Sequence, residues 1–242
     1  TMMIGSVTKS MTTMLMAKAV DEGKMTWETR PNELLPKFSL GNSELQEKIR
    51  MQHLVCACTG VPRKDYELLL NSDQMTPEKA IESLESFETF TDFGESFQYS
   101  NQMVAAGGYV TTAAYGGTWN ELGPKYRSLM QTKLFDPMEM TGTTIDFDEA
   151  TNRENMAFPH ELGIEGDYRQ GSLEHEKFAS SVAPAGAVWS SASDMAKYIQ
   201  TQLGGGKTPG GTRIVAEDPL KKTWQPQIKV QDGMHYGLGW FH

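Results

Sequence analysis

Apolar residues near the start of the chain recur every three or four positions, which is the spacing of one face of an α-helix. In the segment 7–22 this spacing is kept by Met11, Met14, Leu15 and Ala19. A surface helix of a globular protein buries such a stripe and exposes its opposite side. We therefore expect a helix over residues 7–22 that has one buried face.

Residues that cap helices mark the start of several later helical patterns. Helices are expected in NSELQEKIRMQHLVCA, TPEKAIESLES, NQMVAAGGYVTTAAYG, TWNELGPKYRSLMQTKLFDPM and SASDMAKYIQTQL. The first has Asn42 or Ser43 as its candidate N-cap, the second has Thr76, and the last has Ser191 or Ser193. The chain is therefore predicted to be mostly helical.

Few segments are predicted to be strands. TWETRPNELLPKF is expected to be a linker, GGGKTPGGTR a flexible loop, and FPHELGIEGDYRQGSLEHEKF a long polar loop. The tail HYGLGWFH is expected to form one strand that continues to the last residue, His242. A strand needs hydrogen-bonded neighbours, so much of its antiparallel sheet is expected to lie outside this sequence.

The bulk composition excludes several classes of function. Hydrophobic residues make up 38% and charged residues 22% of the chain, an ordinary balance that can build a core. The net charge of −9 and the lack of a basic run argue against a nucleic-acid partner. No run approaches the roughly 20 apolar residues that a membrane-spanning helix requires. We therefore expect no nucleic-acid partner and no membrane span in this chain.

The two cysteines, Cys56 and Cys58, lie two residues apart in LVCACTG. This separation is poor geometry for a disulfide between them, and two thiols alone do not make a zinc site. We expect both to be small buried thiols. None of the histidines is spaced like a pair of metal ligands, so no metal and no other cofactor is expected.

The first candidate for catalysis is the tetrapeptide SVTK, which places Ser6 three residues before Lys9 at the predicted start of the helix. Residues three apart share one helix face, so their side chains can form a hydrogen bond. A lysine whose amine is desolvated can accept the serine proton and make the hydroxyl nucleophilic. The helix N-terminus also directs free N–H groups toward an oxyanion formed at Ser6. An S-x-x-K is expected about once by chance in a chain of this length, so the pair alone is a weak signal.

A second candidate cluster lies in FGESFQYSNQM, which contains Tyr99 and Asn101. Two residues apart in an extended stretch, their side chains would point the same way. Tyr99 would carry a second proton, with its pKa lowered by Lys9, and Asn101 would hold a substrate amide or fix Lys9. The alternatives are a tyrosine of the core and an asparagine of a turn.

Together these motifs resemble those of the serine β-lactamase-like hydrolases, which include class C β-lactamases, family VIII esterases and D-alanyl-D-alanine carboxypeptidases. The first motif of that family is S-x-x-K, and the second is Y-x-N. MQHLVCACTGVP resembles HLL-x-H-T-S-G-x-P, with departures at residues 56–59. LFDPMEMTGTT resembles IFxPLGMxxT, and SSVAPAGAVWSSASDMAKYIQTQL resembles xPAGGLxSTxxDMAxF. The resemblance implies an α/β (α+β) β-lactamase-like fold, of which this chain holds mostly the helical region.

The resemblance also implies a role for each site residue. Ser6 would be the nucleophile that forms an acyl-enzyme, and its backbone N–H would be one oxyanion donor. Lys9 would take the serine proton or lower the pKa of Tyr99. Tyr99 would pass a proton to the leaving group and then activate the deacylating water, and Asn101 would position the substrate and Lys9.

The family's third motif, K-T-G or H-x-G, lies on a strand after the YGLGW segment, and no such motif follows that segment here. Lys207 and Thr208 in GKTPGG are predicted to belong to a loop, because Pro209 replaces the glycine and no strand pattern surrounds them. The resemblance therefore implies a longer parent chain, and impaired activity in a chain without this motif. The expected parts are the nucleophile helix at 1–24, the helical region with the Y-x-N loop at 25–180, and a helix, a loop and the start of the sheet at 181–242.

By resemblance, the parent protein is a serine hydrolase that acts on an ester, amide or lactam. An esterase or peptidase-like activity is favoured over a dedicated β-lactamase. The alternative is a non-catalytic or slowly acylating module that acts like a penicillin sensor. The implied partner is a small-molecule or peptide substrate. The sequence leaves the oligomeric state and the compartment open, although the relatives are often periplasmic or extracellular.

Overall fold

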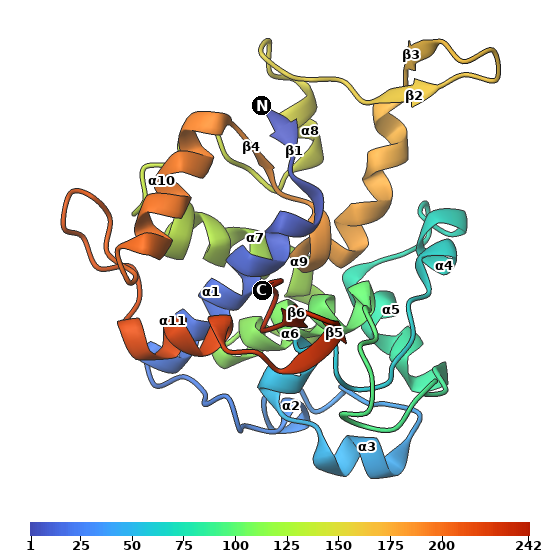
Figure 1. Ribbon diagram of the computed structural model, residues 1–242, viewed down its shortest axis with the longest axis vertical. Coiled ribbons are helices and arrows are strands. Elements are labelled where there is room, and N and C mark those ends of the chain that lie inside the picture. The colour runs from blue at the N-terminus through green and yellow to red at the C-terminus, as the bar shows by residue number, and fades with distance from the viewer.

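Helix α1 (Thr8–Asp21) runs through the middle of the computed structural model, which describes residues 1–242 (Figure 1). It packs against α6 (Asn101–Ala114), α9 (Ala183–Gly186) and α11 (Glu217–Trp224). The other α-helices surround this centre and are α2 (Pro31–Leu34), α3 (Ser43–Lys48), α4 (Asp65–Leu70), α5 (Pro77–Glu82), α7 (Leu122–Met130), α8 (Phe147–Thr151) and α10 (Ala192–Leu203).

The strands are short and form three separate two-stranded antiparallel sheets. β1 (Met2–Met3) pairs with β4 (Trp189–Ser190), which ties the segment leading into α1 to the segment that follows α9. β2 (His160–Leu162) pairs with β3 (Tyr168–Gln170), and this hairpin projects from the body at the upper right of Figure 1. β5 (Ile228–Gln231) pairs with β6 (Met234–Tyr236).

The predicted helices are largely confirmed, and their caps explain where they begin. Asn42, Thr76 and Ser191 are the N-caps of α3, α5 and α10, and each side chain accepts a hydrogen bond from a backbone N–H of the first turn. The segment predicted as a linker contains one helical turn, α2, which Pro31 starts. None of the helices combines the length and the apolar character that crossing a lipid bilayer requires.

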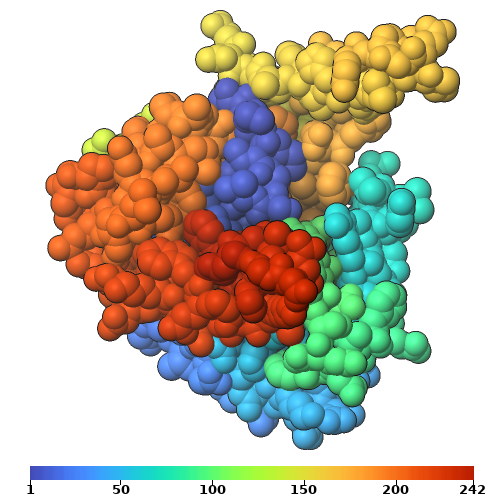
Figure 2. Space-filling model, viewed as in Figure 1, coloured from blue at the N-terminus to red at the C-terminus, as the bar shows by residue number.

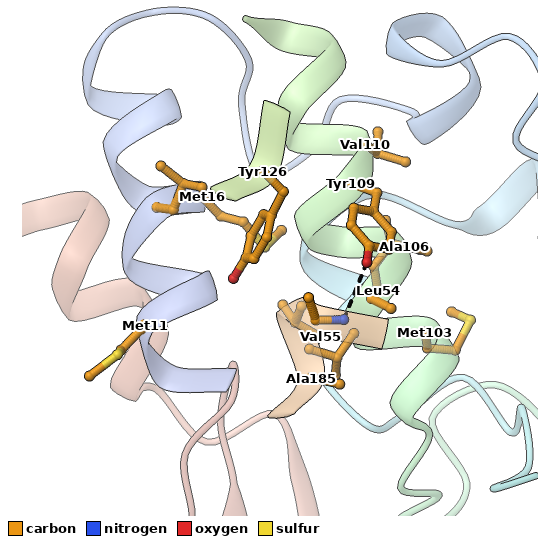
Figure 3. Close-up of a cluster of buried hydrophobic side chains, with 14 of the residues drawn as sticks. Met11, Met16, Leu54, Val55, Met103, Ala106, Tyr109, Val110, Tyr126 and Ala185 are labelled. Atoms are coloured by element: carbon orange, nitrogen blue, oxygen red, sulfur yellow. Dashed lines mark hydrogen bonds between the residues drawn. The ribbon is translucent and has the colours of Figure 1, made fainter. Parts of the chain in front are cut away.

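Two buried tyrosines join the central helices (Figure 3). Tyr109 of α6 and Tyr126 of α7 pack edge to face, with ring centroids 5.8 Å apart. The Tyr109 hydroxyl donates to the Ser181 carbonyl at 3.0 Å and accepts from the Ala183 N–H at 3.2 Å. An unpaired buried polar group costs about 1–3 kcal/mol, so these two bonds fix where α9 begins beside α6.

A close approach of two backbones brings α9 against α6. A Cβ atom at Gly108 would lie 2.5 Å from a side-chain atom of Pro184, closer than such atoms pack. On the other side, the Thr12 hydroxyl of α1 donates to the Pro184 carbonyl at 2.6 Å. The small residues of α6 therefore let α9 fit between α6 and α1, at the end of α1 where the candidate serine and lysine lie.

Helix α1 is more deeply buried than its sequence pattern predicts. Met11, Met14, Leu15 and Ala19 are buried as expected. The expectation of a single buried face is wrong, however, because helices pack on more than one side of α1. Polar residues at its start are consequently buried too, namely Thr8, Lys9, Ser10, Thr12 and Thr13.

Two other segments fold differently from their predictions. The tail is not one strand, because β6 ends at Tyr236, the chain turns at Gly239 with φ +80°, and Phe241 bridges back to Tyr236. The predicted long polar loop contains the β2–β3 hairpin and a 3-10 helix, η6 (Leu173–Val182). Both strands of that hairpin are exposed on both faces, so no apolar alternation marks them in the sequence.

Cys56 and Cys58 form a disulfide, so the expectation of two separate thiols is wrong. Their Cα atoms lie 5.2 Å apart, a separation that suits a disulfide. The backbone can bring them this close because Ala57, between them, has a φ of 53°. The Ala57 carbonyl accepts a hydrogen bond from the Gln98 N–H at 2.8 Å. This loop is therefore joined to the segment that leads to Tyr99.

Candidate active site

Ser6 lies at the exposed end of the central helix, in a 3-10 turn, η1 (Gly5–Val7), that leads directly into α1. Gly5 has a φ of +51°, a conformation that favours glycine. The Ile4 N–H donates to the Val188 carbonyl at 2.9 Å and anchors this turn. Figure 2 shows the blue N-terminal residues at the surface, between the orange and amber parts of the chain. A substrate can therefore reach Ser6, and the first N–H groups of the turn have no intrahelical acceptor.

Lys9 lies one turn further into the helix and is only 1% exposed. Its Nζ atom lies 3.0 Å from Ser6 Oγ, 2.8 Å from Asn101 Oδ1 and 2.7 Å from the Ala185 carbonyl oxygen, all within hydrogen-bonding distance. The predicted contact between Ser6 and Lys9 is therefore present in the structure. The amine is fixed by groups from three parts of the chain, one of which is a backbone carbonyl of α9.

The electrostatics of this position favour an uncharged amine. Burial lowers the pKa of Lys9 from 10.5 to about 7, with Asp65 opposing the change and Arg63 adding to it. A neutral amine has two N–H bonds and one lone pair. The N–H bonds suit the two carbonyl oxygens, of Asn101 and Ala185, which leaves the lone pair for the Ser6 hydroxyl. This arrangement is what removing the serine proton requires.

Tyr99 completes the cluster from a loop distant in sequence. Its hydroxyl donates to Ser6 Oγ at 2.8 Å, and Lys9 Nζ lies 4.6 Å from the centroid of its ring. Burial raises the pKa of Tyr99 above 10.0, and the hydrogen bond to Ser6 only partly opposes this. The expectation that Lys9 lowers the pKa of Tyr99 is therefore wrong. Tyr99 is a neutral phenol that can donate a proton.

Asn101 is the first residue of α6, and so it does not lie in the extended stretch that the sequence suggested. Ser100 caps this helix by accepting from the Met103 N–H. The Asn101 side chain accepts from Lys9 through Oδ1 and donates through Nδ2 to Asp65 Oδ1 at 2.8 Å. The helix start thus directs the amide toward the lysine.

Ser6 and Asn101 line a cleft of about 300 Å³. A larger hollow of about 680 Å³ lies elsewhere and contains neither of them, nor Lys9 or Tyr99. We take the smaller cleft as the candidate site because it contains Ser6, the candidate nucleophile. Its other lining residues are Met3, Gly5, Arg63, Asp65, Glu176, Phe178, Ala179, Val182, Ala185 and Gly186.

Three of the cleft residues that act on Lys9 or Asn101 were not identified from the sequence. Arg63 and Asp65 follow the turn TGVP, and two charged residues after a turn are too common to attract notice. The Ala185 carbonyl carries no side-chain signal at all. The described residues contain no group of three or more His, Cys, Asp or Glu that could hold a metal ion.

The GKTPGG segment lies apart from the cleft. Lys207 is exposed and forms an antiparallel bridge with Arg213 in a loop between α10 and α11. This loop projects at the left of Figure 1 and contributes no residue to the cleft.

The chain is similar to known proteins over most of its length. The sequence model of the Beta-lactamase family matches residues 1–242. Penicillin-binding protein 4 of Amycolatopsis lactamdurans is 22% identical over 239 residues, which cover 98% of this chain and 60% of that protein. The unguisins hydrolase of Aspergillus violaceofuscus is 25% identical over 210 residues, which cover 82% of this chain and 35% of that protein.

Solved structures share the fold. The octameric penicillin-binding protein homologue from Pyrococcus abyssi matches with a TM-score of 0.80 and 23% identity, covering 99% of this chain and 52% of that one. A D-stereospecific amidohydrolase from Streptomyces sp. matches with a TM-score of 0.78 and 18% identity, covering 99% of this chain and 70% of that one. These matches confirm the predicted β-lactamase-like fold. Because the family match extends over all 242 residues, the chain belongs to the Beta-lactamase family.

Proposed function

We propose that the protein is a serine hydrolase that works through an acyl-enzyme on Ser6. The observation that carries this proposal is the 3.0 Å contact between Ser6 Oγ and Lys9 Nζ, made by an amine that is buried and has a pKa of about 7. An exposed lysine would hold its proton at neutral pH and could not accept another. The relatives of this chain include by name a hydrolase and a penicillin-binding protein, which supports the same class.

In the acylation step, the Ser6 oxygen attacks the carbonyl carbon of an ester, amide or lactam. The serine proton passes to the lone pair of Lys9, and the backbone N–H of Ser6 stabilises the oxyanion as one of its donors. When the intermediate collapses, the bond from carbon to the leaving group breaks. The leaving group takes the proton of the Tyr99 hydroxyl, and Lys9 returns its extra proton to Tyr99.

In the deacylation step, a water molecule replaces the leaving group. Because the pKa of Tyr99 is raised, this residue acts as a relay and not as a phenolate base. It accepts a proton from the water while it donates its own proton to Lys9. The hydroxide attacks the acyl carbon, the bond to Ser6 Oγ breaks, and Lys9 returns a proton to the serine.

We favour an ester or a peptide-like amide over a dedicated β-lactam. The names of the similar proteins support this preference, because one is an unguisins hydrolase and another is a D-stereospecific amidohydrolase. Asn101 lines the cleft and contacts Lys9, so we assign it to the positioning of both the substrate and Lys9.

Labelling and turnover by the complete protein test this proposal. A fluorophosphonate probe is expected to modify Ser6, as read by mass spectrometry, and Ser6→Ala is expected to abolish labelling. The matched control is Ser180→Ala, because Ser180 is exposed and lies outside the cleft. The same samples are assayed with p-nitrophenyl butyrate and with nitrocefin, and faster turnover of the ester is expected.

The outcomes separate the alternatives. A long-lived penicillin adduct on Ser6 without turnover of either substrate would favour the slowly acylating sensor. If the fluorophosphonate probe labels the Ser6→Ala protein as strongly as the wild type, Ser6 is not the nucleophile.

A further inference from the structure

Asp65 links the cleft residues into a chain of hydrogen bonds that ends at Lys9. It is the first residue of α4, and its side chain is 19% exposed. One carboxylate oxygen accepts from Asn101 Nδ2 at 2.8 Å, and the other accepts from Arg63 Nε at 2.5 Å. Asn101 in turn accepts from Lys9 at 2.8 Å. Both oxygens of the Asp65 carboxylate therefore accept hydrogen bonds, and Asn101 connects this carboxylate to the Lys9 amine.

The amide of Asn101 has two chemically different ends, and Asp65 distinguishes them. A carboxylate can only accept, so it selects the Nδ2 end of the amide. In the reversed orientation, Oδ1 would face the carboxylate oxygen, and the Nδ2 group would face Lys9. The N–H of the amide would then donate to the lone pair of Lys9, which Ser6 needs. Asp65 therefore opposes the one orientation of Asn101 that would occupy the base.

We propose that Asp65 is a positioning residue, which holds the Asn101 amide so that Lys9 keeps its lone pair directed at Ser6. This inference rests on the proposed serine hydrolase function, and it concerns a residue outside the S-x-x-K and Y-x-N motifs. Arg63 keeps the carboxylate in place from the other side.

The charges around Lys9 give this proposal a distinct signature. The charged or titratable groups at the cleft are Asp65, Arg63, Tyr99 and Glu176. Among them, Asp65 raises the pKa of Lys9 and Arg63 lowers it. Removal of the Asp65 charge therefore lowers the pKa of Lys9, whereas removal of the Arg63 charge raises it. A residue that served only the folding of α4 would not produce these opposite changes.

Substitutions at Asp65 separate the hydrogen bond from the charge. Asp65→Ala removes both, and kcat is expected to fall about 10- to 100-fold with KM little changed, because the base is misplaced. Asp65→Asn keeps an oxygen that can accept from Asn101 but also has an amide N–H that can donate to the reversed Asn101. It therefore selects the Nδ2 end less strictly, and its fall in kcat is expected to be smaller than that of Asp65→Ala. Without the negative charge, however, the acidic limb of its pH profile is expected at lower pH. Arg63→Gln is expected to shift the limb to higher pH.

The titration of Lys9 gives a second readout that needs no turnover. With lysine labelled at ¹³Cε, NMR of the complete protein follows the Lys9 amine directly. Its midpoint is expected to fall in Asp65→Asn and to rise in Arg63→Gln. The matched control is Asp73→Ala, because Asp73 is exposed and is expected to change neither the rate nor the midpoint.

Two results would overturn the role of Asp65. One is an Asp65→Ala protein that folds normally and keeps kcat within twofold of the wild type. The other is a Lys9 midpoint that is the same in all variants. Failure of the proposed function is recognised separately, as a wild-type Ser6 that no acylating probe modifies, and in that case the NMR midpoints still decide whether Asp65 acts on Lys9.

Discussion

Two lysines of this chain lie in short segments that resemble motifs of the family, but their environments are opposite. Lys9 ends the tetrapeptide SVTK and is 1% exposed, whereas Lys207 begins KTPGG and is exposed in a loop. Both belong to segments that resemble motifs of lysine-dependent hydrolases. Only the first has a buried amine in contact with a serine hydroxyl. The difference teaches that the surrounding residues, and not the motif letters, make a lysine into a base.

The physical cause of the difference lies in what covers each amine. Lys9 is enclosed because α6 and α9 pack against α1, and water is replaced there by two carbonyl acceptors. The loop of Lys207 is held by backbone bonds such as the one from the Thr208 N–H to the Thr212 carbonyl at 2.9 Å. Such a loop has no core to bury a side chain in. The Lys207 side chain is therefore exposed to solvent.

The largest expected effect comes from removing each lysine in turn. Lys9→Met is expected to lower kcat/KM for p-nitrophenyl butyrate by about 10²–10⁴-fold, because a general base contributes that much. Lys207→Met is expected to leave kcat/KM within twofold of the wild type. Steady-state kinetics of both variants of the complete protein provide the measurement. Equal losses in the two variants would contradict the distinction between the lysines.

The second effect concerns the phenol that shares Ser6 with Lys9. Tyr99→Phe is expected to reduce kcat by about 10²-fold, because a proton donor and relay is lost while the ring packing is kept. Tyr168→Phe is the matched control, since Tyr168 lies on the exposed hairpin. A p-nitrophenolate leaving group needs little protonation, so the loss is expected to be larger for an amide than for this ester. If both substrates respond alike, Tyr99 acts only in deacylation or in packing.

Much of the site was predictable from local spacing. Ser6 and Lys9 meet because residues three apart share a helix face, and this holds across the junction of η1 and α1. Tyr99 and Asn101 also lie at the cluster, as their motif suggested. The pKa of Tyr99 was not predictable, because it depends on burial by segments remote in sequence. The contact between Lys9 and the Ala185 carbonyl was not predictable either, since every residue has a backbone carbonyl.

The fold was predictable to a similar extent, and the predictions that failed did so for a similar reason. Capping residues located the helices, because a cap acts within four residues of the chain. The tail and the Cys56–Cys58 pair were misassigned. In both cases the outcome depends on a positive φ, at Gly239 and at Ala57, and spacing alone does not reveal such a turn. One of the two residues, Ala57, is not even a glycine.

The next effect concerns stability and again compares the two lysines. The pKa of Lys9 is about 7 in the folded protein against 10.5 in the unfolded chain, so the unfolded chain binds more protons between these values. Stability therefore rises with pH across this window, by about 2 kcal/mol between pH 7.5 and pH 9.5 from this group alone. Below pH 7 the full cost of burying the amine is present.

Urea unfolding of the wild type and of Lys9→Met at pH 7.5 and pH 9.5 measures this contribution. The gain in unfolding free energy on raising the pH is expected to be about 2 kcal/mol larger in the wild type than in Lys9→Met. Lys207→Met is expected to follow the wild type. A wild-type protein and a Lys9→Met protein with the same pH dependence would mean that Lys9 keeps its proton in the fold.

The last expected effect is the pH profile of the wild-type reaction, which needs no substitution. The acidic limb of kcat/KM reports the ionisation of the free enzyme's base, so it is expected near pH 7, with a tenfold loss per pH unit below it. Tyr99 does not produce this limb, because its raised pKa places its ionisation on the basic side. Lys207→Met is expected to reproduce the limb without a shift.

Measurement from pH 5 to pH 8 with p-nitrophenyl butyrate is sufficient, since the ester itself is stable there on the assay timescale. A rate that stayed constant down to pH 5 would mean that the group accepting the serine proton is not Lys9, because an amine with a pKa of about 7 is almost fully protonated at that pH.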